Sequence, residues 1–574
     1  MPATLKSSFT MTDAPDPITL EILQNSLRSI TDETYIALTK AAYSTNIKER
    51  RDHSTALTDA QGRLVVQAEN SLPIHLASML GMMEELLDKY RVEDMAEGDI
   101  FVANDPYVAG GTHLPDVNLA MPCFAGGQLL GFVCNIAHHA DIGGMTPGSM
   151  AGGMSEIYQE GLRIPLVRLF AGGELVQDIF DLLLLNVRVP HERRGDYFAQ
   201  VAACRLGIRR LEELSHRYPT ALLARSFEAI MDRTEARLRT GIAGIPDGRY
   251  EFTDLLDNDG MGTSDIPISV RVDVRGEEIS FDFDGTGQQM KGNFNLTFNA
   301  TQSAVYYVLK AMLDPDLPNN HGLIRAVEIS APLGTLVNAE HPAAVAGRAN
   351  TSQRIVDVLI GALAQALPEQ AVGAANGANV TAVFYGHDPR HNRPYVYLET
   401  LGGGFGGRFT KDGKDGVQVH ITNTSNLPVE SIEAEYPLMV ESYGLIEDSG
   451  GAGKYRGGMG IRRVVRPVGH ETVFSGMGER FVHQPWGIFG GQPGATGSFS
   501  AIGPGRNEET LPDKPNHVPL GPDDALVIET PGAGGYGAPA ERNLEDLAAD
   551  YRGGKFSAAY LEKYYGFKPP PERD

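Results

Sequence analysis

The stretch from residue 101 to residue 144 constrains the fold of this chain most. Its sequence is FVANDPYVAGGTHLPDVNLAMPCFAGGQLLGFVCNIAHHADIGG, and it holds two clusters of metal-binding residue types, His113 with Asp116 and then His138 and His139 with Asp141. Glycine pairs at 110–111 and 143–144 let the backbone turn sharply or approach a ligand closely. The mostly apolar run 128–137 between the clusters predicts a buried strand. The fold must therefore place polar groups at the end of a buried strand.

The two clusters together predict a metal site. A strand that delivers His138 to its end, facing a loop with His113 and Asp116, would bring imidazole nitrogens and carboxylate oxygens together. Zn²⁺ and Mn²⁺ both accept such ligands. The alternative is that these histidines are hydrogen-bonded structural residues, because a His-x-x-Asp motif alone is a weak signal.

Three further residues are candidates outside this stretch. Asp52 lies on, or just ahead of, a short strand that ends at a hairpin turn at 59–62, and the alternative is a surface ion pair with Arg50 and Arg51. His75 opens a helical pattern and is either a site residue or a helix-start histidine. Glu160, like Glu156, lies in a glycine- and methionine-rich segment and is either an acid/base group or a solvated carboxylate.

Length, charge and cysteine use narrow the class of protein. A chain of 574 residues exceeds the ~250–300 residues that one core supports, so two or three domains are expected. A net charge of −24 without a basic stripe disfavours nucleic-acid binding. No apolar run reaches the ~18–20 residues that span a bilayer, and no secretory signal is visible. Three cysteines without metal-type spacing indicate a reducing, cytoplasmic location.

The chain divides into four predicted parts. A disordered leader covers 1–15, and an N-terminal metal-binding region of mixed and helical character covers 16–244, with helical patterns from 16 to 41 and from 190 to 240. Alternating strands at 250–255, 266–274 and 278–283 and helices at 300–312 and 351–367 predict an α+β region over 245–445. Short strands between glycine-rich loops predict a β-rich region over 446–574 with a helical tail at 543–567. The fold class is thus multi-domain α+β.

The glycine-rich segment 401–409, LGGGFGGRF, invites comparison with a phosphate-binding loop. It lacks the Lys-Ser/Thr ending of a P-loop, and no strand–GxGxxG–helix order is present. A backbone loop that closes on the central site is the preferred interpretation.

Several of these segments resemble one family along the chain from about residue 16 to 566. The matching motifs are 16–21 (DPITLE), 49–54 (ERRDHS), 104–107 (NDPY), 110–116 (GGTHLPD), 138–144 (HHADIGG), 160–161 (EG), 448–458 (DSGGAGKYRGG) and 530–537 (TPGAGGYG). In this number and order they identify the chain as similar to the hydantoinase B family. That family includes the B component of ATP-dependent N-methylhydantoinase, the second half of 5-oxoprolinase, the beta component of caprolactamase and the alpha components of acetone and acetophenone carboxylases.

The resemblance implies one subunit of a heteromeric, ATP-dependent cyclic amide hydrolase, of the hydantoinase, 5-oxoprolinase or lactamase type. A hydantoinase A-type ATPase partner, in an α2β2 assembly, would bind ATP with Mg²⁺ and phosphorylate the small cyclic amide, and this subunit would hydrolyse the product. By the same resemblance a divalent metal, Zn²⁺ in preference to Mn²⁺, is held by four ligands that fall here on Asp52, His113, Asp116 and His138. His139 competes with His138, since adjacent strand residues point to opposite faces.

The implied chemistry assigns the remaining candidates. His75, His139 or Glu160 would relay the proton from the attacking water. Backbone N–H groups of the glycine pairs at 110–111 or 143–144 would stabilise the oxyanion. Two alternatives stay open: a subunit of a ketone carboxylase of the acetone or acetophenone carboxylase type, and a scaffold whose histidines are structural.

Overall fold

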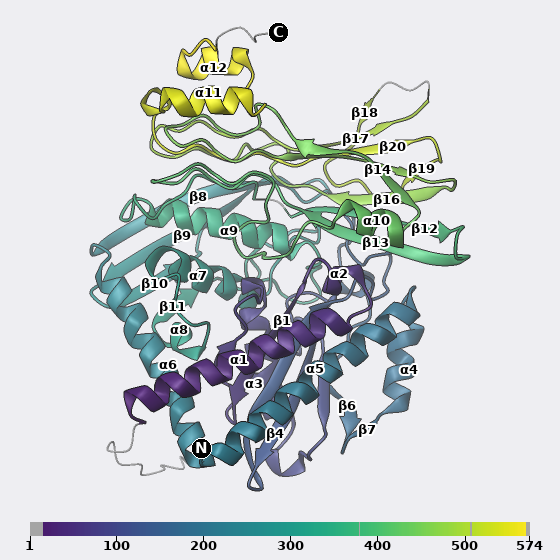
Figure 1. Cartoon of the computed structure of the whole chain (residues 1–574), viewed down its shortest axis with the longest axis vertical. Helices are drawn as coiled ribbons and strands as arrows, with labels where there is room; N and C mark the ends of the chain where they lie inside the picture. Colours follow the sequence, from purple (N-terminus) through teal and green to yellow (C-terminus); the bar gives the residue numbers. More distant parts are fainter. Residues whose placement is uncertain (1–14, 378, 505–507, 570–574) are drawn as a thin grey trace.

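The computed structural model describes residues 15–377, 379–504 and 508–569 (Figure 1). Most of the predicted leader, residues 1–14, lies outside these ranges. Within them, no helix combines the length and the apolar composition that crossing a membrane requires.

The N-terminal part is built on a seven-stranded sheet of order β2-β1-β5-β4-β3-β6-β7. Its strands are β1 (His53–Asp59), β2 (Leu64–Gln67), β3 (Ile100–Ala103), β4 (Asp116–Ala125), β5 (Gln128–His138), β6 (Val167–Ala171) and β7 (Glu174–Leu175). Its helices are α1 (Pro17–Ala41), α2 (Thr45–Lys48), η1 (Pro73–His75), α3 (Leu76–Lys89), η2 (Val92–Asp94), η3 (Ile157–Gln159), α4 (Gln177–Leu185), α5 (Pro190–Arg217) and α6 (Thr220–Ala243). The predicted strand at 128–137 and the predicted hairpin at 59–62 are therefore confirmed.

Helices cover both faces of this sheet, which explains why β1, β4 and β5 are almost continuously buried. Leu23 and Leu27 of α1 pack with Val133 of β5 and Leu211 of α5 on one face. On the opposite face, Met79 and Met83 of α3 belong to a core cluster with Ala120, Phe132 and Cys134. In Figure 1, α1 and α5 cross in front of the strands and α3 lies behind α1.

The middle part contains the three strands that the alternating pattern predicts at 250–255, 266–274 and 278–283. Four strands, β8 (Gly248–Asn258), β9 (Ser264–Arg275), β10 (Glu278–Asp282) and β11 (Val327–Ser330), form a sheet of order β11-β10-β9-β8. The helices here are α7 (Phe298–Leu313), α8 (His321–Arg325) and α9 (Arg348–Leu363). Helix α9 contacts β8 and β9 and also α7. Every residue of α9 is buried, so this helix is the core of the middle part.

The C-terminal part is β-rich, as predicted, and ends in two small helices. One sheet has the order β13-β12-β16-β19 and the other β14-β15-β20-β17-β18. The elements are β12 (Val380–Asp388), β13 (Arg393–Leu401), α10 (Val429–Glu435), β14 (Leu438–Leu445), β15 (Ile461–Pro467), β16 (Thr472–Met477), β17 (Ser498–Ile502), β18 (Glu509–Thr510), β19 (Val518–Leu520), β20 (Ala525–Glu529), η4 (Pro539–Glu541), α11 (Leu544–Arg552) and α12 (Ala558–Tyr565). Each sheet pairs a strand that lies before or ends at residue 445 with a strand that begins after it. The sheets therefore do not divide at residue 445, and the domain boundary predicted there stays a prediction.

The glycine-rich segments pack on one another and not on the central site, which corrects the expectation for 401–409. Gly404 N donates to Pro531 O at 3.1 Å, and Gly407 N donates to Gly534 O at 2.9 Å. A Cβ atom added to Gly406 would lie 1.8 Å from Gly373 O, so the backbones approach more closely than any side chain allows. The clusters of glycine are needed because main chain packs directly against main chain.

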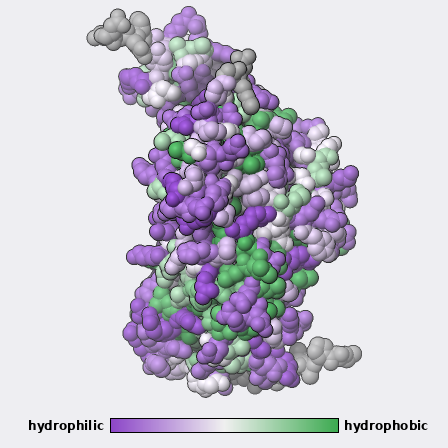
Figure 2. All heavy atoms as spheres, turned by 90° about the vertical axis from the view of Figure 1, so that its right-hand side faces the viewer, coloured by the Kyte–Doolittle hydropathy of each residue, from purple (hydrophilic) through white to green (hydrophobic). Residues whose placement is uncertain are grey.

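One side of the molecule combines a hydrophilic surface with an apolar patch. Figure 2 shows this patch in the lower half of the face that lies on the right in Figure 1. Helix α4 is on this side, and its Leu182 and Leu185 are 52% and 83% exposed.

Candidate metal centre

Strand register brings three of the predicted ligands to one edge of the N-terminal sheet. In the antiparallel β4–β5 pair, Asp116 lies directly opposite His138. On the other side of β5, His138 N donates to Asp52 O at 3.0 Å, one residue before β1 begins. Because β1 and β4 both flank β5, the start of each strand meets the end of β5. Asp52, Asp116 and His138 are neighbours for this reason.

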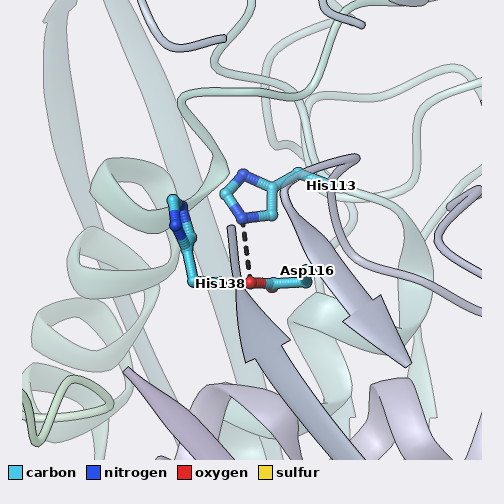
Figure 3. Close-up of side chains that lie close together, drawn as sticks. All are labelled: His113, Asp116 and His138. Atoms are coloured by element: carbon cyan, nitrogen blue, oxygen red, sulfur yellow. Dashed lines mark ion pairs between the residues drawn. The ribbon is translucent and has the colours of Figure 1, made fainter. Parts of the chain in front are cut away.

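His113 joins them from the loop ahead of β4. Its Nε2 lies 3.2 Å from Asp116 Oδ1, and the potential ligand atoms of His113, Asp116 and His138 all lie within 4.8 Å of one another. Figure 3 shows the imidazole rings of His113 and His138 side by side, with the Asp116 carboxylate below the His113 ring. All three side chains are buried.

The hydrogen bonds around His113 and Asp116 leave two lone pairs facing each other. His113 Nδ1 lies 3.2 Å from Ala346 O, and because a carbonyl only accepts, Nδ1 carries the proton and Nε2 a lone pair. Asp116 Oδ2 accepts from Thr112 Oγ1 at 3.1 Å and from Arg348 Nη2, which leaves Oδ1 open. Apart from their contact with each other at 3.2 Å, neither His113 Nε2 nor Asp116 Oδ1 has a hydrogen-bond partner among the described residues. Two buried acceptors in this arrangement fit a bound cation.

His138 is positioned by a chain of polar contacts that begins on α2. Arg50 Nη1 donates to Asn46 Oδ1, so the amide nitrogen of Asn46 faces His138, 2.7 Å from its carbonyl oxygen and 3.0 Å from its Nδ1. Arg50 Nη2 donates to Thr400 Oγ1 at 2.5 Å. These contacts do not identify an open lone pair on His138. Its place in the ligand set therefore rests on its proximity to His113 and Asp116.

The predicted ligand Asp52 does not belong to the group of three side chains whose potential ligand atoms lie within 4.8 Å of one another, and His75 lies between its carboxylate and that of Asp116. His75 Nε2 lies 4.0 Å from Asp52 Oδ1 and 3.7 Å from Asp116 Oδ1, while its Nδ1 shares a hydrogen bond with Ser54 Oγ at 2.9 Å. His75 is the N-cap residue of α3, so it is both a helix-start residue and part of the cluster. Asp52 Oδ2 does lie 3.9 Å from an Arg50 nitrogen. Because both residues are buried, the predicted alternative of a surface ion pair between them is wrong.

Charge and burial set the protonation of these groups. Burial raises the pKa of Asp52, against the opposing effect of Arg50 and His75. Burial acts in the same sense on Asp116, but His113 and Arg348 outweigh it and hold its pKa well below the usual range. Burial lowers the pKa of His113 and of His138. Ionised Asp116 beside neutral imidazoles is the protonation state in which these side chains bind metals.

The two remaining candidates lie outside the cluster. His139 follows the last residue of β5 and points to the other side, where its Nε2 contacts Gln200 Oε1 at 3.0 Å and its ring packs on Tyr197 of α5. Glu160 Oε1 accepts a hydrogen bond from Ala346 N at 2.6 Å. The carbonyl oxygen of the same residue, Ala346, accepts from His113 Nδ1. Glu160 Oε2 is buried with no hydrogen bond to the described residues, and burial raises the pKa of Glu160 to about 8.

Sequence reasoning missed the residues that support the ligands, above all Arg348 and Thr112. Thr112 stands beside His113, and its type suits a hydrogen bond to a carboxylate, so the motif itself held that signal. Arg348 comes from α9, far along the chain, and no local pattern marks it. Asn46 and Arg50 lie in the segment that carries Asp52 and could have been considered with it.

The fold and the site together define a multi-domain α+β protein with a buried His–Asp cluster at the edge of its first sheet. The family model for hydantoinase B/oxoprolinase matches residues 16–539. This chain therefore belongs to the hydantoinase B/oxoprolinase family.

Three relatives are similar to this chain over most of its length. An uncharacterized protein of Methanocaldococcus jannaschii is 38% identical, with 96% of each chain covered. The B component of a putative D-/L-hydantoinase from Pseudomonas sp. (strain NS671) is 35% identical over 94% of this chain and 93% of its own. The 5-oxoprolinase 1 of Arabidopsis thaliana is 34% identical over 91% of this chain, which matches only 42% of that longer protein.

Two solved structures share the fold. The ATP-dependent caprolactamase from Pseudomonas jessenii superposes with a TM-score of 0.92 at 30% identity, covering 98% of both chains. Acetone carboxylase in its nucleotide-free form has a TM-score of 0.88 at 20% identity, over 96% of this chain and 79% of that one. At this lower identity the second likeness shows the fold alone.

Proposed function

We propose that this chain is the metal-dependent hydrolytic subunit of a heteromeric, ATP-dependent cyclic amide hydrolase. Membership of a family that contains oxoprolinase and caprolactamase supports the reaction class. The single observation that carries the metal is the buried pair His113 Nε2 and Asp116 Oδ1, which lie 3.2 Å apart and make no hydrogen bond to any other described residue. Acetone carboxylase is similar in fold at 20% identity, so a ketone carboxylase remains the alternative.

A divalent metal bound by His113, Asp116, His138 and Asp52 would polarise a carbonyl oxygen and make water acidic enough to attack at neutral pH. Zn²⁺ is our first choice, although two histidines and two aspartates also suit Mn²⁺. Arg348 and Thr112 hold one oxygen of Asp116 and so direct the other toward the cluster. His75 Nε2, between two carboxylates, is our first candidate for moving a proton.

Glu160 and His139 have different roles in this proposal. Glu160 binds the peptide of Ala346, whose carbonyl oxygen orients His113, so we propose it as a positioning residue. His139 packs against α5 through Gln200 and Tyr197. We therefore assign it to supporting the end of β5, and not to proton transfer.

The partner in this proposal is an ATPase of the hydantoinase A type, in an α2β2 assembly, which binds ATP and Mg²⁺ and phosphorylates the substrate. Support comes from the names of relatives, which include the B component of a hydantoinase and the beta component of a caprolactamase. A cytoplasmic location fits the three cysteines, Cys123, Cys134 and Cys204, which are all free and buried.

The test is to reconstitute the chain with its ATPase partner and measure ATP-dependent hydrolysis of hydantoin, N-methylhydantoin, 5-oxoproline and caprolactam. We expect one of these rings to open, about one metal ion per chain, and loss of both metal and activity in His113→Ala. His216→Ala, at an exposed position of α5, is the matched control and should keep the metal. Wild-type protein without stoichiometric metal, or full activity in His113→Ala, would refute the proposal. ATP-dependent fixation of bicarbonate onto a ketone would favour the carboxylase.

A further inference from the structure

A cavity of about 300 Å³ lies between α7, the segment 71–76 and the loop 420–423. Leu76, Tyr306 and Pro315 give it apolar walls, and Ser303 and His420 add polar groups. Ser303 is almost fully buried, and the His420 ring is held through Nε2 by Asp357 at 3.1 Å. A concave, mostly apolar space with a few convergent polar groups is typical of a small-molecule site.

Two residues of opposite charge line this cavity, Lys310 in a half-buried position and Glu69 in an exposed one, and they form no ion pair with each other. Lys310 of α7 and Glu69 both line it, yet among the described residues no ion pair joins Lys310 to any carboxylate. Its ammonium donates to Asn319 Oδ1 at 3.2 Å. Burial lowers the pKa of Lys310, against the opposing effect of Asp314, Asp316 and Glu69. A partly buried ammonium with a single neutral partner is well placed to bind a carboxylate from outside the chain.

The cavity adjoins the segment that carries His75. Ser303 Oγ, in the cavity wall, donates to Ile74 O at 3.2 Å and accepts from Ala77 N at 3.2 Å. On the side of His420, Ile74 N donates to Ile421 O at 3.3 Å. The walls of the cavity therefore hold the residues on both sides of His75, whose Nε2 faces Asp52 and Asp116. A ligand bound here would touch the segment that completes the candidate metal centre.

We propose that this cavity binds a small zwitterion, an amino acid, with its carboxylate on Lys310 and its ammonium on Glu69. Tyr306 and Leu76 then contact the carbon chain between the two charges. The choice of ligand rests on the proposed function, because hydrolysis converts an uncharged lactam into an amino acid that carries both charges. The cavity is thus a product site beside the reaction centre, selective for the open chain over the ring.

Calorimetric titration of the full chain alone, without partner or ATP, tests this. The probes are 6-aminohexanoate and L-glutamate, with caprolactam as the uncharged ring and hexanoate as a ligand that lacks the ammonium. We expect an amino acid to bind at least about tenfold more tightly than caprolactam or hexanoate, because each lacks a charge-assisted contact.

Two variants and two matched controls locate the site. Lys310→Met and Glu69→Gln should each weaken binding of the amino acid about tenfold or more, and Glu69→Gln should leave the affinity for hexanoate unchanged. Lys40→Met on α1 and Glu85→Gln on α3, both at exposed positions, should bind like the wild type. Melting temperatures confirm that the variants are folded.

Three outcomes would overturn the proposal: no binding of either amino acid, equal binding of caprolactam, or binding that neither cavity variant weakens. None of them bears on whether the reconstituted complex hydrolyses a cyclic amide. Conversely, an inactive complex whose isolated chain binds 6-aminohexanoate through Lys310 would refute the proposed function and leave the cavity assignment in place.

Discussion

The lone pairs of His113 Nε2 and Asp116 Oδ1 face each other because their other polar atoms are already committed. Ala346 O takes the Nδ1 proton, and Thr112 and Arg348 take Oδ2. Such hydrogen bonds from outside the ligand set fix both the tautomer of a histidine and the orientation of a carboxylate. At this scale the site is prepared for a cation by residues that do not touch it.

Glu160 offers a test of this support through the pH dependence of stability. Its pKa is raised by burial to about 8, against an ordinary value of 4.5. Between these two values the folded protein holds a proton that the unfolded chain has lost, so the contribution of Glu160 to stability falls as pH rises, by at most about 1.4 kcal/mol per pH unit.

Glu160→Gln should remove this loss, because glutamine stays neutral and can still accept from Ala346 N. We expect the two proteins to melt alike near pH 5 and the variant to melt at the higher temperature at pH 8. Thermal melting across this range measures the difference, with the exposed Glu85→Gln as control. Parallel melting curves for wild type and variant at both pH values would contradict the burial argument.

Register is the decisive property at the scale of elements. Asp116 lies opposite His138 in the β4–β5 pair, and His53 lies opposite Ala137 in the β1–β5 pair. A slip of one residue in either pair would turn the side chains to the opposite face of the sheet. The apolar residues on both faces of this sheet oppose such a slip, because it would break their packing against α1 and α3.

The glycine-rich segments behave as one packed element, and a single methyl group tests this. Gly406→Ala would place a Cβ 1.8 Å from Gly373 O, whereas Gly444→Ala in β14 meets nothing within 4 Å. We expect Gly406→Ala to lower the free energy of unfolding by about 1–3 kcal/mol or to prevent folding. Gly444→Ala should be neutral or slightly stabilising. Urea unfolding measures both, and equal stabilities would show that these backbones can separate at little cost.

At the scale of the whole molecule, the candidate metal centre joins parts of the chain that lie far apart in sequence. Its potential ligands come from the first sheet, while Arg348 belongs to α9 and Thr400 to β13. An ion bound by His113 and Asp116 would therefore stabilise the contact between the N-terminal and middle parts as well as its own ligands.

Removing the metal should accordingly lower the melting temperature of the wild type. A ligand that binds only the folded state at 100 times its Kd adds about 2.7 kcal/mol. Dialysis against a chelator should lower the melting temperature, and added Zn²⁺ or Mn²⁺ should restore it. His113→Ala should melt near the metal-free wild type and respond to neither treatment. Identical melting of wild type with and without chelator would argue against a metal at this site.

Much of the fold could be predicted locally. The amphipathic pattern of α1 and α5, the alternation in β8 to β10 and the buried run of β5 all appear where they were expected, because these patterns arise from which face of one element is buried. What the glycine-rich segment 401–409 packs against could not be predicted in this way. Whether a glycine-rich loop lies against a ligand or against another backbone depends on what packs beside it.

The same distinction holds at the candidate metal centre. Local sequence determined that His113 and Asp116 lie three residues apart, that His138 follows a buried run and that Asp52 lies near the start of another strand. The expectation that a loop carries both His113 and Asp116 is corrected by the structure, in which Asp116 is the first residue of β4. Only the tertiary structure decided which atoms of these side chains remain open, since Arg348, Ala346 and Thr400 reach the cluster from distant segments. It also separated His138 from its neighbour His139, because successive residues at a strand end point to opposite sides. The hydrogen-bond partners of a side chain depend on which elements pack beside it, and this packing cannot be read from a single segment of the sequence.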